Sequence, residues 1–217
     1  MKFNETKSAE EPKKEDTPGD IISMLMPEDR PELRVTGIYG DVNEERSSEA
    51  VYGLHASLLT GRKQFPQDPE DPESDIIVSY EPIEFIISTH GGLAAEMFSV
   101  YDTIREIRDE TPVCTKGIGK VMSAGVLLLA CGTKGERRIG RYCRVMIHGV
   151  MAGQHGYLAD VENEFKETKA IQKMYVQALS NETNMSEAYV RKLMNKKTNV
   201  YLDAEEAVKL GIADIIF

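Results

Sequence analysis

Residues 83–112 read IEFIISTHGGLAAEMFSVYDTIREIRDETP. The first five residues form an apolar run of strand length, and Gly91 and Gly92 follow as a turn. Apolar residues then recur at helical spacing until Pro112, which cannot continue a helix. This stretch therefore predicts a strand, a glycine turn and a helix. The apolar residues of the helix are Leu93, Met97, Val100, Tyr101, Ile104 and Ile107.

Strands and helices alternate on both sides of this unit. The alternation predicts an α/β fold with a largely parallel β-sheet and flanking helices. Residues 62–82 interrupt it with four prolines among acidic residues, which predicts an exposed loop, although 76–78 is apolar enough for a brief strand. The other predicted strands are 33–40, 113–115, 139 and 144–147. The other predicted helices are one that ends near Gly61, a buried one at 126–130, a long amphipathic one at 158–179, a short one after Asn184 or Ser186, and one that begins with a capping box at Asp203 and ends at Gly211.

The composition limits the class of protein. A chain of 217 residues, 41% of them apolar, is long enough for one core. Residues 1–30 are charged and contain prolines, which predicts a flexible segment or propeptide before a single domain at 31–217. No apolar run reaches the length of a membrane span and no signal-peptide core follows Lys2, so we expect a cytoplasmic protein. A net charge of −10 would repel nucleic-acid phosphates.

We expect neither a metal ion nor another bound cofactor. Cys114, Cys131 and Cys143 are dispersed and lack the paired spacing of zinc sites or of disulfide frameworks. His55 and His155 have no ligand partner four residues further along. The chain also has no phosphate loop and no dinucleotide-binding fingerprint.

Two residues could carry acyl-transfer chemistry. Ser123 stands between a glycine-containing segment and the buried helix, where N–H groups without helical partners could stabilise an oxyanion. Serine is also a preferred helix N-cap, so a capping role stays open. His148 follows the predicted strand 144–147, at a strand end where α/β folds present functional groups, and a histidine held by core hydrogen bonds fits equally well. The G-x-S-x-G spacing of α/β-hydrolases is missing.

The chain carries three segments in a fixed order: SAG at 123–125, RVMIH at 144–148 and YLDAEEAVKLGIAD at 201–214. In order and spacing they resemble ClpP, the family of proteolytic subunits of the ATP-dependent Clp protease, and the resemblance covers roughly residues 33–217. It implies a ClpP/crotonase-type fold with Ser123 as nucleophile and His148 as general base. By the same resemblance, the N–H groups of Gly92, with Gly91 as the alternative, and of Ala124 form the oxyanion hole.

The resemblance also implies an assembly and its partners. A family member is a serine endopeptidase that cleaves unfolded polypeptides inside a chamber of stacked seven-membered rings. A hexameric AAA+ unfoldase docks on the ring and consumes the ATP, so the resemblance predicts a homo-oligomer that binds no cofactor itself.

Two positions depart from the family pattern. Asn199 stands where the family has the aspartate of the catalytic triad. An asparagine can orient the ring of His148, but it cannot stabilise the imidazolium by charge. Asp203 is a nearby carboxylate, although helix capping explains it at least as well. His90 replaces a proline of the family, and it either lines the site or fills the turn.

Three other functions stay open. The chain could be a weakly active or non-catalytic ring subunit, with Asn199 as a sign of lost activity. It could be a dedicated processing protease, for example one that matures viral shell proteins. It could also be an acyl-CoA enzyme of the wider crotonase superfamily, which shares the glycine turn and the oxyanion hole.

Overall fold

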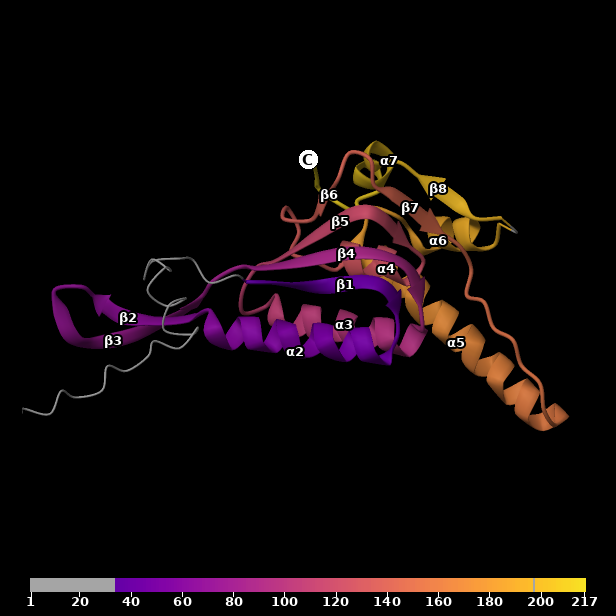
Figure 1. The fold of residues 1–217 in the computed structure, drawn as a ribbon, viewed down its shortest axis with the longest axis horizontal. Coiled ribbons are helices and arrows are strands. Elements are labelled where there is room, and N and C mark those ends of the chain that lie inside the picture. Colours follow the sequence, from indigo (N-terminus) through magenta and orange to yellow (C-terminus); the bar gives the residue numbers. More distant parts are fainter. Residues whose placement is uncertain (1–33, 197) are drawn as a thin grey trace, which may run out of the picture. The chain divides into compact units, whose positions relative to one another are not determined.

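The structure, a computed structural model, describes residues 34–196 and 198–217. The predicted flexible segment 1–30 lies outside the described residues. A seven-stranded sheet forms the centre of the described part, and every strand pair in it is parallel except β7 with β8 (Figure 1). Its strands are β1 (Val35–Val42), β4 (Ile83–Gly92), β5 (Val113–Met122), β6 (Arg138–Ile139), β7 (Arg144–Ile147), β8 (Val200–Leu202) and β9 (Ile215–Ile216).

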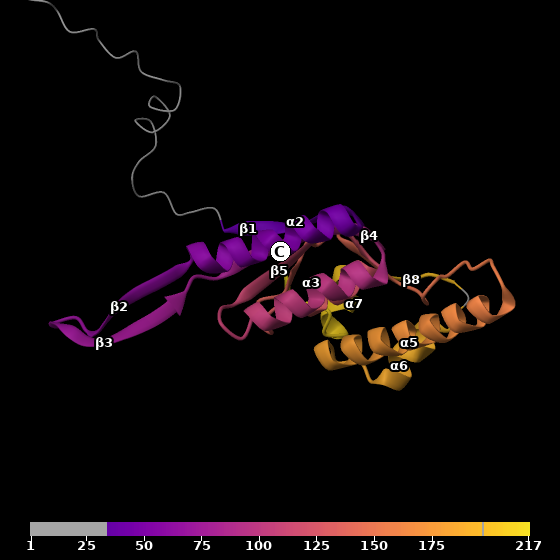
Figure 2. The ribbon, with the colours of Figure 1, turned by 90° about the horizontal axis from the view of Figure 1, so that it is seen from below.

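Helices alternate with these strands and flank the sheet. The helices α2 and α3 lie side by side along one face (Figures 1 and 2). This arrangement confirms the predicted α/β fold with a largely parallel sheet. Among the described residues, no helix combines the length and the apolar character of a membrane span. The helices are α2 (Glu44–Thr60), α3 (Ala94–Ile107), α4 (Ala124–Ala130), α5 (Leu158–Glu182), α6 (Glu187–Met194) and α7 (Ala204–Lys209).

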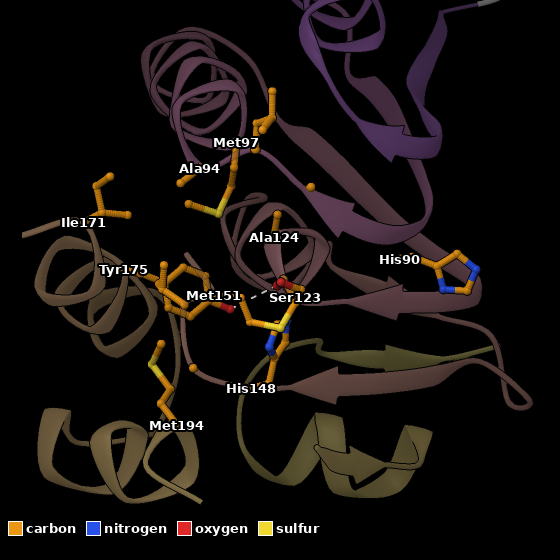
Figure 3. Close-up of a pocket in the computed structure, with 14 residues that line it drawn as sticks. His90, Ala94, Met97, Ser123, Ala124, His148, Met151, Ile171, Tyr175 and Met194 are labelled. Atoms are coloured by element: carbon orange, nitrogen blue, oxygen red, sulfur yellow. Dashed lines mark hydrogen bonds between the residues drawn. The ribbon is translucent and has the colours of Figure 1, made fainter. Parts of the chain in front are cut away.

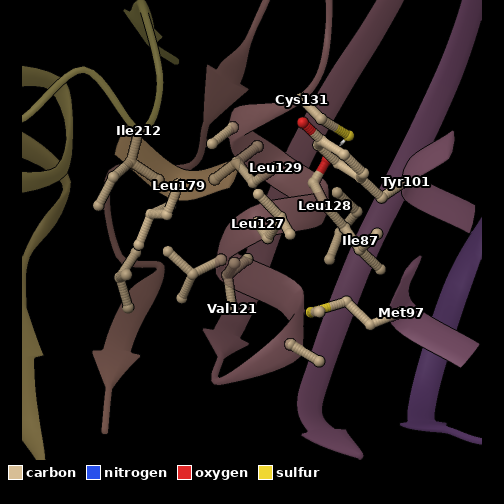
Figure 4. Close-up of a cluster of buried hydrophobic side chains, with 14 of the residues drawn as sticks. Ile87, Met97, Tyr101, Val121, Leu127, Leu128, Leu129, Cys131, Leu179 and Ile212 are labelled. Atoms are coloured by element: carbon tan, nitrogen blue, oxygen red, sulfur yellow. Dashed lines mark hydrogen bonds between the residues drawn. The ribbon is translucent and has the colours of Figure 1, made fainter. Parts of the chain in front are cut away.

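The helix α4 lies at the centre of the hydrophobic core. All seven of its residues are buried, as the continuously apolar run predicts. The leucine side chains at 127–129 pack among Ile87 of β4, Val121 of β5 and Leu179 of α5 (Figure 4). Because close-packed side chains surround it, α4 gives the residue before it, Ser123, a rigid support.

The strand β5 is longer than predicted. The sequence predicts a strand at 113–115 followed by a glycine-containing loop, whereas the strand runs to Met122, directly before Ser123. Its first half pairs with β6 through Lys116 and Gly117, and its last three residues pair with β7. The glycines in this segment led to the prediction of a loop. The segment is a strand because β4, β6 and β7 supply hydrogen-bond partners for its backbone.

The segment at 62–82 is largely exposed, as predicted, and the possible strand at 76–78 lies within a longer strand, but the prediction of a loop is wrong. Strands β2 (Arg62–Asp68) and β3 (Asp71–Tyr80) form an antiparallel hairpin that is a sheet of its own (Figure 1). Phe65 lies opposite Ile77 in its register. The prolines misled the prediction, because proline is compatible with a strand that has a free edge, and Pro66 lies within β2.

The two halves of α5 differ in their surroundings. Its first half is exposed, and Leu158 and Phe165 expose 74% and 57% of their surface. Its last two turns bury one face. There the carboxylate of Glu182 accepts hydrogen bonds from Arg108 at 2.9 Å and from the hydroxyl of Tyr101 at 3.1 Å, both from the α3 region. These bonds fix the carboxyl-terminal half of α5 against α3.

Candidate active site

Ser123 joins the end of β5 to the start of α4 in an unusual backbone conformation. Its φ is +54° and its ψ is −117°, and it is the one non-glycine residue with positive φ in the described part of the chain. A conformation of this kind costs about 1–3 kcal/mol, persists only where neighbours hold it, and is typical of functional sites. The amide of Ser123 donates to the carbonyl oxygen of Met146 in β7 at 2.8 Å.

The side chain of Ser123 does not cap the helix. Ser123 occupies the N-cap position of α4, but its hydroxyl makes no capping hydrogen bond. The interpretation of Ser123 as a helix cap is therefore wrong, and the hydroxyl lines a pocket instead.

This pocket has a volume of about 270 Å³ and collects residues from distant parts of the chain. Figure 3 shows Ser123 and His148 next to each other at its base. Among the described residues, no hydrogen bond joins the hydroxyl of Ser123 to the ring of His148; such bonds often form only when substrate binds. Large apolar side chains make much of the remaining wall, and they are Leu93, Met97, Val150, Met151, Ile171 and Met194.

The paired part of β7 and β8 ends next to both His148 and Asn199. The antiparallel pairs of β7 and β8 include Met146 with Tyr201 and Ile147 with Val200. Continued by one residue, this register sets His148 opposite Asn199. Directly opposed residues on antiparallel strands project from the same face with Cβ atoms about 5 Å apart.

Asp203 lies elsewhere and has another role. It begins α7, and its carboxylate accepts the amide of Glu206 at 2.8 Å as part of a capping box, which confirms that prediction. The three residues of β8 separate it from Asn199, a span of about 13 Å along the chain. The geometry therefore favours Asn199 over Asp203 as the neighbour of His148.

The two glycines after β4 have different surroundings. The Gly91 amide donates to the hydroxyl of Thr89 at 2.9 Å, so this N–H group is engaged. Leu93 donates to the Val42 carbonyl oxygen at 2.8 Å. Because successive N–H groups of a strand point to opposite sides, the Gly92 N–H faces away from β1. Gly92 lines the pocket, and of the two glycines it has the geometry of a donor.

Ala124 supplies a second backbone donor. It is the first residue of α4 and lines the pocket. The first N–H groups of a helix have no acceptor within the helix. Gly92 and Ala124 thus place N–H groups near Ser123 from two different elements.

His90 is peripheral. It is exposed and contributes to the rim of the pocket, but its ring points away from Ser123 and His148 (Figure 3). Among the described residues, no group of three or more His, Cys, Asp or Glu side chains is arranged to hold a metal ion.

Sequence reasoning missed Tyr175. This residue lies in the buried half of α5, and its hydroxyl donates to the carbonyl oxygen of Ser123 at 3.1 Å. Burial raises the pKa of Tyr175 far above its usual range, so the hydroxyl keeps its proton. The available signal was a tyrosine among buried apolar residues, because a buried phenol needs a hydrogen-bond partner.

The fold and the pocket define an α/β protein that presents a serine, a histidine and backbone N–H donors at the carboxyl end of a parallel sheet. Residues 75–217 match the family model of Clp protease. The chain belongs to the Clp protease family. The match confirms the resemblance to ClpP and the ClpP/crotonase-type fold, and it covers every candidate site residue from His90 to Asp203.

Gly91 provides a test of how Ser123 is held. A Cβ atom at Gly91 would lie 2.6 Å from the Ser123 Cβ, and its φ is +102°. Gly40 is a matched control, because its φ is +98° and a Cβ there would meet nothing within 4 Å. Gly40→Ala should lose about 1–2 kcal/mol from backbone strain alone. Gly91→Ala should lose clearly more free energy of unfolding in urea. Equal losses would show that Gly91 does not support Ser123.

Proposed function

We propose that this protein is a serine endopeptidase in which Ser123 is the nucleophile and His148 the general base. The observation that carries the proposal is the strained turn at Ser123, whose hydroxyl shares a pocket with His148. A strained non-glycine residue persists where the surrounding structure enforces it, and such residues cluster at active sites. Membership of the Clp protease family supports the choice of the peptide bond as substrate.

The geometry suggests the following reaction. His148 takes the proton of the Ser123 hydroxyl while the oxygen attacks the peptide carbonyl carbon. The resulting oxyanion accepts hydrogen bonds from the N–H groups of Gly92 and Ala124. His148 then returns the proton to the leaving amine, which breaks the peptide bond. A water molecule, deprotonated by His148, then attacks the acyl carbon, the ester bond to Ser123 breaks, and His148 returns the proton to the Ser123 oxygen.

The apolar wall suggests which substrates fit. Met97, Ile171 and Met194 line the pocket beside Ser123. A volume of about 270 Å³ suits one large side chain rather than an acyl-CoA molecule. We therefore propose that the pocket holds an apolar side chain next to the scissile bond of a polypeptide.

The first test is labelling with a fluorophosphonate probe, which reacts with activated serines. The full-length protein should gain the mass of one probe per chain in an intact-mass measurement, because His148 activates Ser123. Ser123→Ala should gain none. Absence of labelling in the assembled wild-type protein would favour the second candidate function, a non-catalytic ring subunit. Two observations favour testing it: Asn199 is neutral, and no hydrogen bond joins Ser123 to His148 among the described residues.

Asn199 predicts a measurable weakness of the site. A neutral amide opposite His148 cannot stabilise the imidazolium by charge, and loss of that charge lowers turnover severely in other triads. Asn199→Asp should therefore raise kcat for a peptide substrate by about tenfold or more. Asp203→Ser is the control, since serine keeps the helix cap and removes the carboxylate. A fall in kcat for Asp203→Ser, with no gain for Asn199→Asp, would assign the role to Asp203.

Exposed apolar surface supports the proposed assembly into stacked seven-membered rings. Leu158 and Phe165 lie in the exposed half of α5, and apolar surface of this kind is typical of interfaces. Light scattering should give a mass near fourteen times the 24.3 kDa of one chain. A monomer at micromolar concentration would contradict the chamber.

The proposed chamber implies particular substrates and partners, and we also propose a cellular compartment. Polypeptides unfolded by an AAA+ unfoldase are the proposed substrates, and the cytoplasm is the proposed compartment. A dedicated processing protease would use the same chemistry on fewer substrates, so the peptides that it releases distinguish the two roles.

A further inference from the structure

We infer that Tyr175 is a positioning residue that orients the Ala124 N–H toward the oxyanion. The inference rests on the proposed function, because it assigns Tyr175 a task within the same site. Tyr175 acts through the backbone of Ser123, with its hydroxyl 3.1 Å from that carbonyl oxygen (Figure 3).

The argument begins with one peptide group. The carbonyl of Ser123 and the N–H of Ala124 belong to the same planar unit, and in a trans peptide they point in opposite directions. Fixing the carbonyl oxygen therefore fixes the direction of the N–H. The carbonyl accepts one other hydrogen bond, from the Val126 amide at 3.0 Å, which lies within the first turn of α4. Tyr175 supplies the partner from outside that turn.

The phenol comes from a rigid element. Tyr175 exposes 6% of its surface, and Val176 and Leu179 next to it are fully buried. Two turns further along α5, Glu182 is bound by Arg108 at 2.9 Å. These contacts keep α5 from turning about its axis, so the hydroxyl has a fixed direction. Burial also raises the pKa of Tyr175, which keeps it a donor.

The bond also strengthens the donor at the other end of the peptide. A carbonyl that accepts a hydrogen bond polarises its peptide group, and the N–H of that group becomes a better donor. Ser123 has a backbone conformation that its neighbours must enforce. Without the phenol, only the Val126 amide holds the carbonyl oxygen, so the peptide plane can tilt toward a relaxed conformation and turn the Ala124 N–H away from the oxyanion.

The test is Tyr175→Phe, which removes the hydroxyl and keeps the ring. Loss of a whole oxyanion donor costs about 10²–10³ in kcat, and a misdirected donor should cost about tenfold. We expect kcat for a peptide substrate, and the second-order rate of fluorophosphonate labelling, to fall about tenfold with KM unchanged. Both follow from poorer stabilisation of the charged oxygen in the transition state.

Tyr101→Phe is the matched control. Tyr101 also exposes 6% of its surface, and its hydroxyl bonds a buried group, Glu182, at 3.1 Å, but it does not line the pocket. The melting temperature of the Tyr101→Phe variant should fall at least as far as that of Tyr175→Phe. Its labelling rate should stay at the wild-type value, because both Arg108 bonds to Glu182 remain and still hold α5 in place.

The outcomes separate the inference from the proposed function. Wild-type labelling at Ser123 with an undiminished rate in Tyr175→Phe would overturn the inference and leave the nucleophile in place. A rise in KM alone would show that Tyr175 only lines the pocket. An equal loss of labelling rate in Tyr101→Phe would show that the effect comes from lower stability. Either result would overturn the inference. Failure of the wild-type protein to label would overturn the proposed function, and the inference with it.

Discussion

The amide of Ser123 donates to the carbonyl oxygen of Met146 at 2.8 Å, and the geometry of the pocket depends on this hydrogen bond. It continues the ladder in which Met122 pairs with Met146, two residues before His148. A slip of one residue between these strands would turn the His148 side chain to the other face of the sheet. The register of β5 and β7, more than any side-chain contact, therefore brings the serine and the histidine together.

The N–H groups of Gly92 and Ala124, the proposed oxyanion donors, share one structural feature. Each N–H belongs to a peptide group whose carbonyl end is held by a neighbouring element. Tyr175 of α5 holds the peptide between Ser123 and Ala124, and the ladder with β1 holds the peptide before Gly92. Backbone N–H groups fixed in this way need no reorganisation when charge develops, which is the property that makes an oxyanion hole effective.

The sequence predicts the elements that depend on residues close together in the chain. It does not predict the elements that depend on contacts between distant segments. The β4–turn–α3 unit, the buried helix α4 and the capping box at Asp203 follow from local patterns. The second half of β5 does not, because its glycine-rich sequence becomes a strand only beside β4 and β7. Tyr175 is 52 residues from Ser123, and His148 and Asn199 follow and precede the paired strands β7 and β8. No local pattern specifies either placement.

The hairpin and the pocket lie at opposite ends of β4. Arg34 donates to the carbonyl oxygen of Glu81 at 2.7 Å, beside the base of the hairpin, and β4 then runs from Ile83 to Gly92 in the pocket wall, a length of about 30 Å. The family match begins at residue 75, within β3, so most of the hairpin lies outside it. No described residue of the hairpin lines the pocket, so this part of the fold and the residues around Ser123 are structurally separate features of the chain.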